Sequence, residues 1–233
     1  MTDPVLAVLP ERIPYILFGT AFLLIGLCAC GFAAMHHRSR LKLLTWLGLW
    51  SAFEGTRYLF GSLLALRLLP HWFNAGFPYL DVVLSYLVVV VALMAFLQLS
   101  QGKLRIFLQS VILVGLTVAL AGIAFFLLTG SPHKLMLYNQ ILAAGLIAVL
   151  GTVVAVPRLS RKFLILHNRS VISAGILLFA MEAMYGTLSL PLGYPSPPEI
   201  LDPSGFAVLL FCFGYVAAQR LEISSLPPAG HRA

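Results

Sequence analysis

The sequence predicts an all-α integral membrane protein, a bundle of seven transmembrane helices. Of its 233 residues, 60% are hydrophobic and only 10% are charged, and the mean hydropathy is +0.96. Soluble domains carry about 25% charged residues, so this chain has the composition of a protein that lies almost wholly in a bilayer. Its net charge of +7 therefore does not indicate nucleic-acid binding, because in a membrane protein the distribution of charge matters more than the sum.

Seven apolar stretches are long enough to cross a bilayer, which needs about 20 apolar residues per helix. The first is too long for the apolar core of a signal peptide, so we expect it to be retained as a helix. Together the spans make residues 1–223 one transmembrane domain, followed by a short cytoplasmic tail, 224–233. In order, the predicted spans are 13–35, 42–69, 78–98, 104–128, 136–156, 170–190 and 204–221.

Prolines and a capping residue mark several helix ends. Pro78 suits the start of the third span, and Pro157 closes the fifth. Asp202 and Pro203 have the pattern of an N-cap followed by proline at the first helical position, where the missing N–H costs nothing. The seventh helix is therefore expected to begin at this pair.

Basic residues gather in alternate connections. Lysine and arginine favour the cytoplasmic side of a membrane, so the N-terminus is predicted outside and the C-terminus in the cytoplasm. The same basic face is expected to meet anionic lipid head groups. The residues concerned are Arg38, Arg40, Lys42, Lys103, Arg105, Arg158, Arg161, Lys162 and Arg169.

Three ionisable residues lie near the middle of predicted spans: Glu54 and Arg57 in the second, and Glu182 in the sixth. Charges in hydrocarbon cost at least a few kcal/mol each on insertion scales, so they usually pair within a bundle or serve a site. Each glutamate lies 12 residues past the inner end of its span. Tyr58 and Tyr185 follow on the outward side, each near glycine and a hydroxyl residue, which hints at a duplicated three-helix unit.

Two interpretations of these charges remain open. In the first, Arg57 is neutralised by Glu54, or by Glu182 across the bundle, and merely holds helices together. In the second, the charged residues form the bottom of a pocket that is open to the exterior. Two carboxylates beside one arginine leave a formal negative charge, which favours a cationic or polar ligand, a proton or sodium. The candidate ligand-binding or ion-coupling residues are Glu54, Arg57, Tyr58, Arg67, Asp81, Asn139, Glu182 and Tyr185.

Two of these candidates have simpler alternatives. Asp81 is predicted in the first turn of the third span, where a carboxylate complements the helix dipole. Arg67 lies near the outer end of the second span and is long enough to reach the lipid head groups.

The sequence indicates no cofactor, metal site or catalytic group. Retinal needs a lysine within the membrane, whereas all four lysines fall in or beside connections. Membrane haem needs facing histidines, whereas the six histidines lie at interfaces or in the tail. No nucleophile motif or glycine-rich phosphate loop stands out, so the protein is not expected to be an enzyme.

Residues 40–50 (RLKLLTWLGLW), followed by 55–59 (GTRYL), carry a family resemblance. This segment resembles the second helix of bacterial seven-transmembrane sensor regions, the receptors with diverse intracellular signalling modules. The resemblance implies an input domain in the bacterial inner membrane that signals to a cytoplasmic output domain or partner. It carries no fixed catalytic motif, so it assigns no site residue. The chain departs from the pattern at Pro227 and Pro228, where such sensors continue into a coiled coil.

The function expected from the sequence is therefore a membrane sensor or receptor module. It would bind a small ligand, lipid or ion in the outer half of the bundle and signal through its last helix. The alternative is a small secondary transporter that couples protons or cations through Glu54 and Glu182.

Overall fold

The computed structural model confirms the all-α prediction. It describes residues 4–36, 41–65, 68–129, 133–156, 158–159, 169–189 and 201–225. Helices account for nearly all of these residues, and none of them belongs to a β-strand. The helices are α1 (Pro4–His36), α2 (Lys42–Ala65), α3 (His71–Leu99), α4 (Gly102–Thr129), α5 (His133–Ala155), α7 (Arg169–Ser189) and α8 (Leu201–Ser225).

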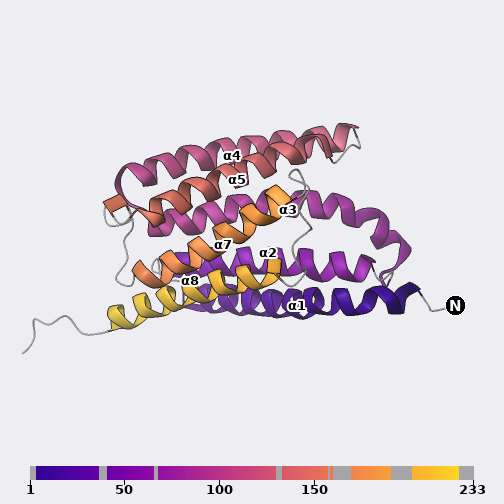
Figure 1. Ribbon diagram of the computed structural model, residues 1–233, viewed down its shortest axis with the longest axis horizontal. Coiled ribbons are helices and arrows are strands. Elements are labelled where there is room, and N and C mark those ends of the chain that lie inside the picture. Colours follow the sequence, from indigo (N-terminus) through magenta and orange to yellow (C-terminus); the bar gives the residue numbers. More distant parts are fainter. Residues whose placement is uncertain are drawn as a thin grey trace, which may run out of the picture.

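The helices run roughly along one axis (Figure 1). Helices α1 and α2 lie along one side of the bundle, α4 and α5 along the opposite side, and α3 between them. Further contacts join α3 to α5, α5 to α7, α7 to α8, and α8 back to α2. Five helices, α2, α3, α5, α7 and α8, therefore close a ring, with α1 packed outside α2 and α4 outside α3.

Three of the described helices are long and apolar enough to cross a membrane: Leu9–His36, Tyr79–Leu99 and Gly102–Thr129. Helix α4 shows most clearly a surface suited to lipid, because its leucines at positions 113, 120 and 127 are all exposed on one side. Such a row of exposed leucines is costly in water but ordinary against lipid. These helices indicate an integral membrane protein.

Shorter apolar helical segments occupy three further predicted spans. They are Ala143–Ala155, Ser170–Glu182 and Pro203–Gln219. Helix α2 is less apolar than α1, α3 and α4 because it carries Glu54 and Arg57 near its middle.

Helices α1 and α2 pack with their backbones almost in contact. Gly19 lies opposite Gly55, and Gly26 lies opposite Gly48, so glycines spaced by seven residues on each helix face one another. A Cβ added at Gly19 would lie 2.6 Å from the backbone nitrogen of Leu59. Close packing of small residues is a main source of helix association in membranes, where lipid removes the hydrophobic driving force. The α1–α2 hairpin is therefore stabilised by close backbone packing at these glycines.

Some helix boundaries differ from those predicted. Helix α3 begins at His71, preceded by Pro70, so that Pro78 lies seven residues inside the helix rather than at its start. Helix α8 begins at Leu201, one residue before Asp202 and two before Pro203. Apolar runs mark the part of a helix that suits hydrocarbon, whereas the hydrogen-bonded helix continues into polar residues beyond it. Pro157 and residues 226–233 of the predicted tail lie outside the described residues.

The glycine contacts predict a sharp difference between two substitutions on α1. Gly26→Leu forces a side chain into the backbone of α2 and should lower stability by at least about 1–3 kcal/mol, the usual cost of overpacking. Gly31→Leu is the matched control, because no atom lies within 4 Å of a Cβ at that position. Thermal unfolding in lipid nanodiscs measures both. Equal midpoints for the two variants would contradict this account of the hairpin.

Candidate functional site

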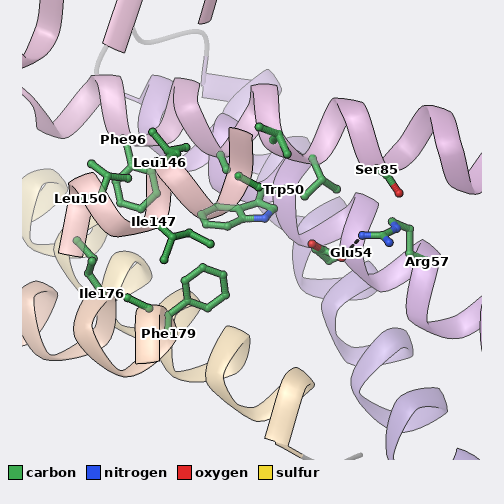
Figure 2. Close-up of a pocket in the computed structure, with 15 residues that line it drawn as sticks. Trp50, Glu54, Arg57, Ser85, Phe96, Leu146, Ile147, Leu150, Ile176 and Phe179 are labelled. Carbon is green, nitrogen blue, oxygen red and sulfur yellow. Dashed lines mark hydrogen bonds and ion pairs between the residues drawn. The ribbon is translucent and has the colours of Figure 1, made fainter. Parts of the chain in front are cut away.

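A cavity of about 250 Å³ lies between α2, α3, α5 and α7. Glu54, Arg57 and Ser85 line it at one end, and aromatic and aliphatic side chains line the other (Figure 2). A mostly apolar cavity with a few convergent polar groups is the usual form of a small-molecule site. Its apolar lining includes Val89, Phe96, Leu146, Leu150, Ile176 and Phe179.

The polar end is built around Arg57. Its Nη1 atom donates to Glu54 Oε2 at 3.2 Å, and its Nε atom donates to Asp81 Oδ1 at 3.0 Å. Both bonds are charge-assisted and hence stronger than neutral ones. With all three groups ionised the cluster carries a formal charge of −1, and it ties α2 to α3.

Asp81 has a different role from the one predicted. It lies ten residues after the first residue of α3, not in the first turn, because the helix begins at His71. Its carboxylate pairs with Arg57 across the helix interface. Ser85, one turn later, donates its hydroxyl hydrogen to the backbone carbonyl of Asp81 at 2.8 Å.

The second partner of Arg57 could not be read from the sequence. The pair of Arg57 with Glu54 follows from their spacing of three on one helix. The pair with Asp81 joins residues 24 apart, and their contact depends on how α3 packs against α2.

Helix α2 presents different residues on different faces. Trp50, Glu54 and Arg57, at spacings of four and three, line the cavity. Ser51 faces α1 instead, where its hydroxyl donates to the carbonyl of Phe22 at 2.8 Å and is fully buried. Tyr58 also lies against α1, with its ring centroid 5.7 Å from that of Tyr15. The predicted polar face is thus divided, and Tyr58 is not among the residues that line the cavity.

Trp50 is the residue that sequence reasoning missed. It is 4% exposed, and its ring contacts Phe96 on α3, Phe179 on α7 and Phe206 on α8, with centroids 6.1, 6.2 and 5.2 Å away. Its indole Nε1 is buried with no hydrogen-bond acceptor among the described residues. The available signal was its spacing of four before Glu54, which places both residues on one face.

Glu182 lies on α7 at the contact with α8. Its carboxylate packs against the backbone of Gly205, at the position that a Cβ on that glycine would occupy. Seven residues away on each helix, Gly175 packs against Cys212 in the same manner. Glu182 is not among the residues that line the cavity. Arg57 forms its ion pairs with Glu54 on α2 and Asp81 on α3.

The side chains of three predicted candidates lie outside the described part of the structure. Arg67 lies outside the described residues. Asn139 and Tyr185 fall on α5 and α7, respectively, but their side chains lie outside the described part of the chain.

No group of three or more histidine, cysteine, aspartate or glutamate side chains within the described ranges is placed to hold a metal ion. Comparison with known protein families, with curated proteins and with solved structures finds no significant match. The cavity and the charge cluster at its end therefore carry the argument about function.

The ion cluster predicts a non-additive set of variants. Arg57→Leu leaves two carboxylates facing one another and should cost about 1–3 kcal/mol, less than the 3–5 kcal/mol of a fully buried pair, because Arg57 is 27% exposed. Adding Glu54→Gln and Asp81→Asn to that variant removes the repulsion and should restore much of the loss. Denaturant unfolding in nanodiscs measures the series.

Arg105→Leu serves as the control, because Arg105 is exposed in the first turn of α4. A triple variant less stable than Arg57→Leu would show that charge balance does not organise this end of the cavity.

Proposed function

We propose that the protein is a membrane sensor input module that binds a small ligand in the cavity between α2, α3, α5 and α7. The observation that carries this proposal is the cavity itself, apolar along most of its length and polar at one end. Such a chamber suits a molecule with an apolar body and a small polar head. A charge cluster with a structural role alone has no need of a cavity beside it.

The route from the cavity to the rest of the protein runs through aromatic contacts with α8. Trp50 contacts Phe206 at a centroid distance of 5.2 Å, and Phe96 contacts Phe213 edge-on at 5.3 Å. Trp50 and Phe96 line the cavity, whereas both partners belong to α8. A ligand that binds one arrangement of these rings better than another shifts the position of α8. This helix leads into the cytoplasmic tail, which would act on an output domain or a separate signalling partner.

The finer topology belongs to the same proposal: seven spans, an outside N-terminus, a cytoplasmic C-terminus and a place in the bacterial inner membrane. Three observations support the seven spans and the orientation. Shorter apolar helices accompany the three long ones, and successive helices run in alternate directions. Four exposed cations, Lys42, Lys103, Arg105 and Arg158, lie at helix ends that this alternation brings to one end of the bundle, where they would meet anionic lipid.

A secondary transporter is the second candidate. It is favoured by the formal charge of −1 on the cluster of Glu54, Arg57 and Asp81, which a proton or a cation would neutralise. Against it, the four cavity helices are each continuous over their described residues, whereas many transporters interrupt helices at the site. Ion-gradient-driven flux in proteoliposomes that Glu54→Gln abolishes would favour the transporter over the sensor.

The topology predicts opposite behaviour for two fusions. Green fluorescent protein fused after Ala233 should fluoresce, because it folds in the cytoplasm, whereas alkaline phosphatase fused there should be inactive. Fusing the same reporters after Thr129, at the end of α4, should reverse both results. An active phosphatase at the C-terminus would invert the proposed orientation.

Filling the cavity should abolish ligand binding. Ala143→Phe places a ring in the cavity from α5, whereas Ala148→Phe, on the same helix, places an equal ring on its exposed side. In native mass spectrometry of protein from its own membranes, we expect a bound small molecule on wild type and on Ala148→Phe, and none on Ala143→Phe. Identical bound molecules on all three would contradict a ligand site in this cavity.

The sensor proposal can also be tested by hydrogen exchange on the same preparations. Removing the bound molecule from wild type should change hydrogen exchange in α8, and Ala143→Phe should show no further change under the same treatment. If hydrogen exchange in α8 does not change when the ligand is removed, the protein binds a ligand but does not signal through α8 as proposed.

A further inference from the structure

The indole N–H of Trp50 is a donor with no acceptor within the described part of the chain. An indole nitrogen donates and cannot accept, and in buried tryptophans it normally finds a partner. Trp50 is 4% exposed, and it lines the cavity. Figure 2 shows the nitrogen-bearing edge of its ring turned toward the charged end of the cavity. This donor points to a ligand atom that accepts a hydrogen bond.

The nearest charged residue on the same helix face is Glu54, one turn further along α2. Residues spaced by four on a helix have Cβ atoms about 5–6 Å apart, and Figure 2 shows Glu54 between Trp50 and Arg57. Arg57 donates to Oε2 of this carboxylate, and an ionised carboxylate, with about four lone-pair sites, can accept from several donors at once. A ligand head beside Trp50 therefore also meets an acceptor that takes a donated hydrogen.

These two neighbours discriminate between head groups. A carboxylate or phosphate would accept from Trp50, but Glu54 and Asp81 would repel it. An ammonium would donate to Glu54 and leave the N–H of Trp50 unpaired. A hydroxyl does both, because it carries one donor and two acceptor lone pairs, and it is small enough to leave no other polar atom against the apolar wall.

The cavity is partly open, so its volume gives the size of the part of the apolar body that it holds. An apolar cavity of about 150 Å³ in another protein binds benzene. Scaled to about 250 Å³, the same packing accommodates roughly ten carbon atoms.

From these observations we infer that the ligand is a small apolar alcohol, a hydrocarbon of roughly ten carbon atoms with one hydroxyl group. The hydroxyl oxygen accepts from Trp50 Nε1, and the hydroxyl hydrogen is donated to the carboxylate of Glu54. The hydrocarbon lies along the apolar side chains of α3, α5 and α7. This inference rests on the proposed function, whose ligand it specifies by chemical class.

The test compares four probes that share a tail and differ in the head: n-decanol, n-decylamine, n-decanoate and n-decane. Saturable binding of each radiolabelled probe is measured to the full chain in lipid nanodiscs. Empty nanodiscs and Ala143→Phe define the binding that does not involve the cavity. We expect n-decanol to bind tightest to wild type.

Trp50→Phe removes the donor and keeps a ring. It should lower the ratio of n-decanol to n-decane affinity by roughly three- to tenfold, the value of one neutral hydrogen bond. Trp46→Phe, one turn earlier on α2, is the matched control and should leave the ratio unchanged, because Trp46 does not line the cavity. The ratio separates the lost donor from the lost ring area, which affects both probes.

The possible outcomes test the alcohol head group, the role of Trp50 and the ligand cavity separately. Tightest binding of n-decylamine or n-decanoate, or equal binding of n-decanol and n-decane, overturns the alcohol and leaves the ligand cavity standing. An unchanged ratio in Trp50→Phe overturns the role of this tryptophan. Absence of saturable, cavity-dependent binding for all four probes overturns the alcohol and the proposed function together. The comparison of head groups on wild type remains decisive if Trp50→Phe fails to fold.

Discussion

A guanidinium group inside an apolar helix bundle must be neutralised, and the way Arg57 is neutralised determines how α2 meets α3. Glu54 alone would balance the charge within one helix. The second carboxylate, Asp81, comes from the neighbouring helix and holds it in one rotational setting, because the bond requires Nε of the arginine to face α3. That setting turns Val88, Val89 and Phe96 of α3 toward the cavity. The polar end and the apolar wall of the cavity thus belong to one orientation of α3, which this ionic contact helps to hold.

The outer face of α2 supports this arrangement from behind. Gly48 and Gly55 bring α1 to within backbone contact, and the buried bond from Ser51 to the carbonyl of Phe22 fixes the register of the two helices. A close-packed hairpin deforms little, so the opposite face of α2, which carries Trp50 and Glu54, starts from a rigid base. Binding residues held by rigid elements lose less freedom when a ligand arrives.

Local features of this structure could be predicted from the sequence, whereas the contacts between distant helices could not. Apolar runs identified the helices, and a spacing of three identified the pair of Glu54 with Arg57. Nothing in a single sequence distinguishes Asp81, which joins the ion cluster, from Glu182, which packs against Gly205. The idea of a duplicated unit remains a prediction, although α2 makes its glycine contacts with the preceding helix, and α7 with the following one.

The packing of α8 explains how a small ligand could have a large effect. Its contact with α7 is intimate, because Gly175 receives Cys212 and Gly205 receives the carboxylate of Glu182. Its contact with α2 is smaller and depends on aromatic rings such as Phe206 against Trp50. In the proposed sensor, a ligand that displaces Trp50 would disturb the smaller contact first, and α7 and α8 would then move together as one hairpin. Since α7 also lines the cavity, the proposed ligand binding would be coupled to movement of the C-terminal end of α8.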